Sequence, residues 1–407
     1  MSSSSSFSDW HDDHPWRPAT LQVRGGLSRS GFDETSEGLF LTSGYVYGSA
    51  AEAQAAFEGK IDRYIYSRYG NPTVGVFEER LRLIEGAEAC KATATGMAAV
   101  FSALACQLNA GDRVVASRAL FGSCKVVISD ILARWGIETV LVDGTNLDAW
   151  ERELQTPTDV VFFESPSNPT LEIIDIAAVS ERAHAAGATV VVDNVFASPV
   201  VQSPLALGAD IVVYSTTKHI DGQGRTLGGA VLASQQFIDE HFQLFYRHTG
   251  PAMSPFNAWV ALKGLETLDL RVRAQSASAL TVAQWLDDHD GVATVRYPFL
   301  ASHPQSELAQ HQMTTGGTVV TFTVEGSTSQ AFEIVDALRV FDISNNLGDT
   351  KSLVTHPGTT THRMLTPGER LEVGLAEGTI RLSIGLEDVA DLIEDLDRAL
   401  LGSGGSR

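Results

Sequence analysis

The sequence is poor in basic residues and in cysteine, and both shortages narrow its possible functions. Lys and Arg number 29 against 50 Asp and Glu, which gives a formal net charge of −21. Nucleic acids and anionic membranes bind proteins through cationic faces, so neither is an expected partner. The three scattered cysteines, Cys90, Cys106 and Cys124, show no paired spacing. Such a set predicts reduced thiols in a cytoplasmic protein.

Long apolar runs and targeting signals are missing as well. No apolar stretch approaches the roughly 20 residues of a membrane helix, so no membrane span is expected. Residues 1–6 are mostly serine and lack the basic and apolar segments of a secretion signal. Residues 10–14 (WHDDH) hold two His and two Asp that could bind a metal. A polar tail is the favoured interpretation, and we predict no metal site.

What the sequence does contain is the pattern of an α/β protein. Its 407 residues suffice for two or three domains, and helical periodicity alternates with short β-branched runs from residue 73 onward. Such alternation predicts a mostly parallel sheet with helices on both faces, and ligands bind beyond the carboxyl ends of its strands. The expected strands are residues 113–116, 138–142, 159–163, 188–192, 209–213 and 229–232, and the expected helices include 97–108, 124–135 and 175–187.

The last part of the chain predicts a separate, smaller α+β domain. Its expected strands are residues 318–324 and 379–383, and its expected helices are 330–338 and 388–400. The stretch before residue 73 is rich in Gly, Ser and Tyr and has no clean period, which favours an extended arm. We therefore predict an N-terminal tail and arm at residues 1–72, a large domain at 73–262 and a C-terminal domain at 263–407.

Lys218 and Asp193 carry the chemical argument. Lys218 closes the run YSTTK directly after the expected strand 209–213, and Asp193 follows the expected strand 188–192. Pyridoxal phosphate (PLP) needs a lysine as covalent anchor and an acidic residue that keeps its pyridine nitrogen protonated. Burying an ionised carboxylate at the end of an apolar strand is energetically unfavourable unless a cation pairs with it, and a pyridinium would supply that cation. We therefore predict PLP as the cofactor, held between these two residues.

The cofactor hypothesis also requires a phosphate site and a carboxylate clamp. Gly96 and Met97 stand at an expected helix start, where backbone N–H groups bind phosphate. Ser215 and Thr217 could add hydroxyl groups. Arg381 lies inside an otherwise apolar strand and suits bidentate binding of a substrate carboxylate. A buried structural ion pair is the alternative interpretation of Arg381.

Several longer motifs resemble one known family. Over residues 21–400 the chain is similar to the Cys/Met-metabolism PLP-dependent enzymes, which include cystathionine γ-synthase, γ-lyases and homoserine-ester sulfhydrylases. The resemblance implies the type I fold of PLP-dependent transferases. The matching segments are residues 66–73 (YSRYGNPT), 95–99 (TGMAA), 164–169 (ESPSNP), 193–194 (DN) and 215–218 (STTK).

The resemblance also implies roles that composition could not reveal. Tyr66 and Arg68 would reach the phosphate of the cofactor in a neighbouring subunit, so the active unit would be at least a dimer, usually a tetramer, with shared active sites. Asn168 would hydrogen-bond the phenolic oxygen of the cofactor. Ser352 would join Arg381 in holding the substrate carboxylate.

Phe121 departs from the family pattern. Most members have a tyrosine stacked on the cofactor ring in a Leu-Tyr-Gly-Gly segment, where this chain has LFGS at residues 120–123. Phe121 can still stack but has no hydroxyl to exchange protons. Together with residues 221–225 and 348–353, Phe121 makes the chain resemble most the family members that replace the acyloxy group of an O-acylhomoserine with sulfide. This resemblance implies the succinyl ester as the expected substrate and homocysteine, for methionine biosynthesis, as the expected product.

Other functions remain open at this point. A cystathionine γ-synthase or a γ-lyase would use the same cofactor, and a catalytically silent binding protein could have kept the fold. The sequence does not fix the acyl group, the sulfur donor or the role of Arg225. Cys124 lies near the proposed site, but a catalytic thiol is not favoured.

Overall fold

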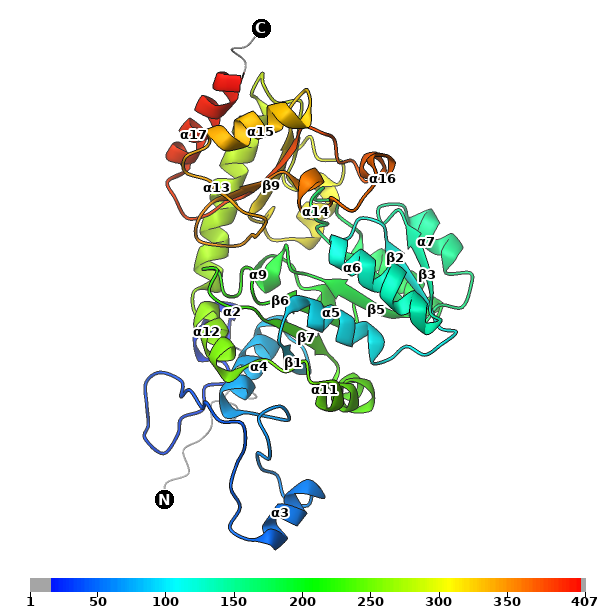
Figure 1. The fold of residues 1–407 in the computed structure, drawn as a ribbon, viewed down its shortest axis with the longest axis vertical. Helices are drawn as coiled ribbons and strands as arrows, with labels where there is room; N and C mark the ends of the chain where they lie inside the picture. Colours follow the sequence, from blue (N-terminus) through cyan, green and yellow to red (C-terminus); the bar gives the residue numbers. More distant parts are fainter. Residues whose placement is uncertain (1–15, 404–407) are drawn as a thin grey trace.

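The computed structural model describes residues 16–403, whose elements are grouped around two β-sheets (Figure 1). The WHDDH segment at residues 10–14 and the serine run before it lie outside the described residues. The larger sheet has seven strands in the order β1-β7-β6-β5-β4-β2-β3. These strands are β1 (Ala89–Thr93), β2 (Arg113–Ser117), β3 (Glu138–Val142), β4 (Val160–Glu164), β5 (Thr189–Asp193), β6 (Ile211–Ser215) and β7 (Gly229–Ala233).

The larger sheet is mostly parallel, as the sequence predicts. Only β7 runs antiparallel to its neighbours, β1 and β6. Helices cover both faces of the sheet. The α-helices within residues 16–403 are α2 (Pro18–Arg24), α3 (Ala50–Phe57), α4 (Pro72–Glu85), α5 (Gly96–Ala105), α6 (Gly122–Val126), α7 (Leu147–Glu153), α8 (Ile176–Ala185), α9 (Ser198–Val201), α10 (Gln235–Phe237), α11 (Gln243–Thr249), α12 (Pro255–Leu265), α13 (Leu268–Asp287), α14 (Ser306–Gln312), α15 (Thr328–Ala337), α16 (Pro367–Glu372) and α17 (Val389–Ser403).

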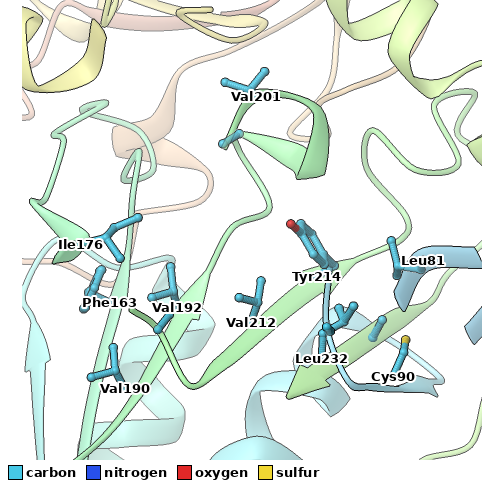
Figure 2. Packing of buried hydrophobic residues seen from close by; sticks show 14 of the residues in the cluster. Leu81, Cys90, Phe163, Ile176, Val190, Val192, Val201, Val212, Tyr214 and Leu232 are labelled. Atoms are coloured by element: carbon cyan, nitrogen blue, oxygen red, sulfur yellow. The ribbon is translucent and has the colours of Figure 1, made fainter. Parts of the chain in front are cut away.

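Two hydrophobic clusters lie on opposite faces of this sheet. Val190 and Val192 of β5 belong to one cluster, and Val191 between them belongs to the other. Successive side chains of a strand point to opposite faces, so a strand covered on both sides is apolar throughout. Figure 2 shows Val190 and Val192 beside Val212 and Tyr214 of β6 on the shared face. The core thereby fixes the strand ends that carry the polar residues.

The smaller sheet has its own core and lies in the upper part of Figure 1. The final helix, expected at residues 388–400, packs into this core through Leu392 and Leu396. The predicted domain boundaries at residues 72 and 262 stay predictions. The strands, in the order β10-β11-β12-β9-β8, are β8 (Thr294–Arg296), β9 (Val319–Thr323), β10 (Asp342–Ile343), β11 (Leu353–Thr355) and β12 (Thr379–Ser383).

The structure differs from the sequence expectation in a few elements. The helix expected at residues 124–135 begins at Gly122 and continues as a π-helical turn (Val127–Ile131) and a 3₁₀ turn (Leu132–Trp135). Strands β1, β8, β10 and β11 were not expected. The arm contains short helices, and α3 lies at its tip, apart from both sheets (Figure 1). Within residues 16–403, no helix combines the length and the apolar character that a membrane crossing requires.

Candidate active site

Three neighbouring strands bring the predicted chemistry to one edge of the larger sheet. β4, β5 and β6 are parallel and end at Glu164, Asp193 and Ser215. A cavity of ≈ 220 Å³ lies beyond these ends. All but three of the predicted site residues line it, namely Gly96, Met97, Phe121, Asn168, Asp193, Ser215, Thr217, Lys218 and Arg381.

Lys218 projects into the cavity just after β6. Its ammonium Nζ donates a hydrogen bond of 2.5 Å to Oδ1 of Asn346. Burial, with a contribution from the nearby charge of Arg381, lowers the pKa of Lys218 to about 8. A neutral amine is therefore accessible near physiological pH, as an anchoring and proton-transferring lysine requires.

Asp193 is a half-buried residue that ends β5 and lines the cavity. Its Oδ1 accepts a hydrogen bond of 3.0 Å from the backbone N–H of Val195. Burial raises the pKa of Asp193 to about 7. This carboxylate thus lacks the stabilisation that a cation would give, and a protonated ring nitrogen above it would provide that charge.

The start of α5 forms the predicted phosphate cradle. Thr95 caps the helix through its hydroxyl, which accepts from the backbone N–H of Ala98 at 3.0 Å. The first N–H groups of a helix have no partner within the helix and attract anions. A Cβ on Gly96 would lie 2.6 Å from Cβ of Ser215, so only glycine lets this helix start meet the end of β6. Thr217 also lines the cavity, and its hydroxyl accepts a hydrogen bond of 3.1 Å from the backbone N–H of Gly228.

Arg381 on β12 brings the smaller sheet into the cavity. Its Nη1 donates to Oδ1 of Asn168 at 2.9 Å, and its Nη2 donates to the carbonyl oxygens of Asn345 and Asn346 at 3.0 and 3.2 Å. Its buried Nε has no hydrogen-bond partner among residues 16–403. No carboxylate pairs with this guanidinium in that range, so the alternative of a structural ion pair loses its support, and a bound anion fits the open donor.

Tyr66 and Arg68 lie on the arm and do not line the cavity. Tyr66 is 43% exposed. Arg68 donates a hydrogen bond to the backbone carbonyl of Arg247, and its guanidinium stacks 4.9 Å from the ring centre of Tyr69. Within one chain these two residues are therefore not brought together with Lys218.

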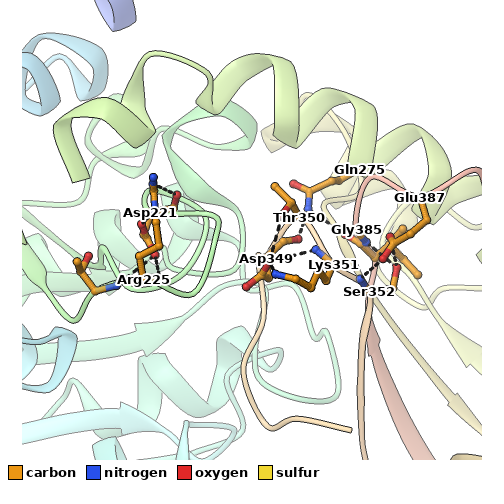
Figure 3. Close-up of polar contacts among 11 residues, drawn as sticks. Asp221, Arg225, Gln275, Asp349, Thr350, Lys351, Ser352, Gly385 and Glu387 are labelled. Carbon is orange, nitrogen blue, oxygen red and sulfur yellow. Dashed lines mark hydrogen bonds and ion pairs between the residues drawn. The ribbon is translucent and has the colours of Figure 1, made fainter. Parts of the chain in front are cut away.

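Ser352 also lies outside the cavity lining. Its hydroxyl donates to Oε2 of Glu387 at 2.8 Å and accepts from the backbone N–H of Gly385 at 2.9 Å (Figure 3). The side chain is fully buried in these contacts. The same figure shows Arg225 bound to Asp221, with Nε 2.8 Å from Oδ1. Ser352 is thus engaged by Gly385 and Glu387, and Arg225 is engaged by Asp221 of its own loop.

Sequence reasoning missed two residues of the site. Asn346 contacts both Lys218 and Arg381. It lies two residues before the segment 348–353, so the motif did not include it. Glu164 stood inside a matching motif, but no role was assigned to it. Cys124 does line the cavity, and burial holds the pKa of its thiol well above the usual range. This agrees with a thiol that is not reactive.

PLP fits this set of groups. The helix start of α5 suits a phosphate, Asp193 suits a ring nitrogen, Lys218 supplies a neutral amine, and the open Nε of Arg381 suits a carboxylate. Phe121 adds an aromatic surface to the wall. A mixed α/β fold with such a cavity at its strand ends defines the class of PLP-dependent enzymes of fold type I.

Comparisons with known proteins agree with that class. The family described as "Cys/Met metabolism PLP-dependent enzyme" matches residues 19–401. A Mycobacterium tuberculosis protein named O-succinylhomoserine sulfhydrylase is 62% identical over 386 residues, covering 94% of this chain and 95% of that protein. A Pseudomonas aeruginosa protein of the same name is 47% identical, with 94% of each chain covered.

A solved structure points the same way. A Campylobacter jejuni protein that carries N'-pyridoxyl-lysine-5'-monophosphate superposes with a TM-score of 0.91 at 32% identity, covering 95% of this chain and 100% of that one. The chain therefore belongs to the Cys/Met metabolism PLP-dependent enzymes.

Proposed function

We propose that this enzyme is an O-succinylhomoserine sulfhydrylase, which converts O-succinyl-L-homoserine and sulfide to L-homocysteine and succinate in methionine biosynthesis. The 62% identity to a protein of that name, over 94% of the chain, carries the proposal. The cavity supports it, because Phe121, which has no hydroxyl group, is among the residues that line it. Succinate leaves as a stable carboxylate and needs little acid assistance, so an aromatic residue without a hydroxyl is sufficient there.

The side chains of the cavity divide the work. PLP, when bound, supplies the electron-withdrawing ring that stabilises carbanionic charge next to the amino group. Lys218 would anchor it, and its Nζ would accept the α-proton of the substrate, which the lowered pKa allows. Asp193 would hold the positive charge at the ring nitrogen. Arg381 binds the substrate carboxylate through Nε, the donor without a partner in the described residues.

The remaining predicted groups place the cofactor and the substrate. The backbone N–H groups of Gly96 and Met97, with the hydroxyls of Ser215 and Thr217, would hold the phosphate. Asn168 would reach the phenolic oxygen while it also accepts from Arg381. A β-proton is removed after the α-proton, so that succinate can leave the γ-carbon; sulfide then adds there as HS⁻, and protons return to the α- and β-carbons. Ser352, with its hydroxyl already bound to Glu387, supports the carboxylate clamp indirectly in this proposal.

The active enzyme is proposed to be an oligomer with shared sites. Tyr66 and Arg68 belong to the arm, whose tip lies apart from both sheets (Figure 1), and neither residue lines the cavity of its own chain. The arm exposes large apolar side chains that a neighbouring subunit would cover, among them Phe32, Leu41, Val46 and Phe57. A dimer, usually doubled to a tetramer, would bring these two residues to the phosphate of a second site. A cytoplasmic location, with its three cysteines reduced, belongs to the same proposal.

Turnover with matched substrates tests the reaction. Purified enzyme is given succinyl- or acetyl-homoserine with sulfide, with cysteine or with no nucleophile, and homocysteine, cystathionine and 2-oxobutyrate are quantified. We expect homocysteine from the succinyl ester and sulfide to form fastest. Faster cystathionine formation with cysteine would identify a cystathionine γ-synthase, and 2-oxobutyrate without a nucleophile would identify a γ-lyase. A protein that stays colourless with PLP would support the silent binding protein.

A further inference from the structure

Glu164 is a buried carboxyl beneath the cavity for which the proposed reaction has no task. It ends β4, is 4% exposed, and lies opposite Asp193 in the register of β4 and β5. One carboxyl oxygen of Glu164, one carboxyl oxygen of Asp193 and the Sγ atom of Cys124 all lie within 4.8 Å of one another. Two carboxyl groups so close in a buried site do not both ionise readily, because each negative charge destabilises the other.

The partners of Glu164 are donors without a formal charge. The backbone N–H of Phe121 donates to its Oε1 at 2.7 Å. The thiol of Cys124 and the backbone N–H of Asn168 also donate hydrogen bonds to the carboxyl group of Glu164. The two cations of the cavity are engaged elsewhere, since Lys218 bonds to Asn346 and Arg381 bonds to Asn168. Within residues 16–403, no ion pair reaches Glu164.

Glu164 and Asp193 therefore differ in what can neutralise them. Burial first, and the charge of Asp193 second, hold the pKa of Glu164 well above the usual range. Asp193 faces the position of the cofactor nitrogen, which brings a positive charge when the ring is protonated. The thiol of Cys124 stays neutral, because its own pKa is raised by burial, so it supplies no competing charge.

We propose that Glu164 is a positioning residue that keeps the proton of this carboxyl pair, so that Asp193 alone carries the negative charge beneath the ring nitrogen. Its second task is to hold Phe121 through the backbone N–H at the start of α6. The aromatic wall and the charged partner of the ring are thus connected through one side chain. This inference rests on the proposed use of PLP at this site.

Two substitutions distinguish the need for a neutral side chain at position 164 from the need for a hydrogen bond to the N–H of Phe121. Glu164→Gln is neutral and keeps a carbonyl oxygen for the N–H of Phe121, whereas Glu164→Ala leaves that buried N–H without a partner. We expect Glu164→Ala to weaken PLP affinity by roughly 10- to 100-fold and to shift the pH titration of the visible absorbance of the holoenzyme. Glu164→Gln should stay within about threefold of the wild-type affinity, with an unshifted titration. Equal damage in both variants would show that an ionised Glu164 is required and would overturn the proposal.

Infrared spectroscopy reads the proton directly and needs no cofactor. The difference spectrum of the cofactor-free, full-length wild type minus Glu164→Gln at neutral pH should contain the C=O stretch of a protonated carboxylic acid. Glu369→Gln is the matched control, because Lys125 holds the pKa of exposed Glu369 at about 2, and its difference spectrum should contain only carboxylate bands. Carboxylate bands for Glu164 would overturn the proposal, even if Glu164→Ala did not fold. A wild type that binds no PLP would refute the proposed function, while the infrared result would still settle the proton on Glu164.

Discussion

Two hollows of the molecule differ in what lines them. The hollow along the arm measures ≈ 1020 Å³ and is lined by arm residues, with Arg247 from α11. The cavity at the strand ends measures ≈ 220 Å³ and draws on both sheets. Only the smaller one contains a lysine and carboxyl groups whose pKa values burial displaces far from the ordinary range. Displaced protonation equilibria mark functional sites better than volume does.

The contrast extends to how each hollow is supported. Residues at the ends of β4, β5 and β6 are fixed by strands that are buried on both faces. The arm instead leaves Phe32 93% and Val46 91% exposed. Its hollow is thus bounded by a segment that packs little against its own chain, which suits a surface completed by another subunit. If this contrast holds, substitutions in the cavity should abolish the reaction, and substitutions in the arm should affect the active site of a neighbouring subunit.

Removing the anchor should have the largest effect. Lys218→Ala is expected to lower turnover by about 10²–10⁴-fold or more, and to remove the visible absorbance of the bound cofactor, because no second lysine lines the cavity among the described residues. Absorption spectra and initial rates measure both. Lys60→Ala, on the arm, is the matched control and should change neither. A spectrum unaltered by Lys218→Ala would refute the anchor assignment.

The carboxylate clamp should give the next largest effect. Arg381→Ala is expected to raise KM for the amino-acid substrate by roughly 30- to 1000-fold, since losing one member of a buried charge contact costs about 2–4 kcal/mol. Ser352→Ala should change KM by no more than about threefold, and should lower the free energy of unfolding by about 1–2 kcal/mol, because its hydroxyl serves Glu387 and Gly385. Steady-state kinetics and urea unfolding separate the two. Equal KM increases would restore the direct role predicted for Ser352.

Mixing two inactive proteins tests the arm. In the Tyr66→Ala,Arg68→Ala variant the cavity residues are unchanged, and in the Lys218→Ala variant the arm residues are unchanged. If sites are shared across a two-fold axis, equal and random mixing should restore about a quarter of wild-type activity, because half of the dimers are mixed and each has one complete site. Subunit exchange is verified by native mass spectrometry. Confirmed exchange without any recovery would place a complete site within one chain.

Local sequence signals predicted the larger sheet and most of the cavity for a physical reason. Strands buried on both faces are continuous apolar runs, so β5 and β6 and the polar residues at their ends were recognisable. Strand β1 was not predicted, because Lys91 interrupts its short apolar run and its pairing with β7 depends on residues distant in the sequence. The role of Asn346 was not predicted either, because its contact with Lys218 joins residues 128 positions apart. Ser352 was chosen by resemblance, which could not reveal the competing contact with Glu387.

The smallest predicted effect concerns stability and again compares the cavity with the arm. The pKa of Lys218 is about 8 in the folded protein, against an ordinary value of 10.5, so the unfolded chain binds more protons between these pH values. The free energy of unfolding of the cofactor-free enzyme should therefore rise from pH 8 to 10.5, by about 1–3 kcal/mol from this group. Lys218→Met should lose that part of the rise, whereas Lys60→Met, whose lysine side chain is 69% exposed, should keep it. Urea unfolding across this pH range measures the difference, and identical slopes for Lys218→Met and wild type would mean that the cavity does not desolvate its lysine.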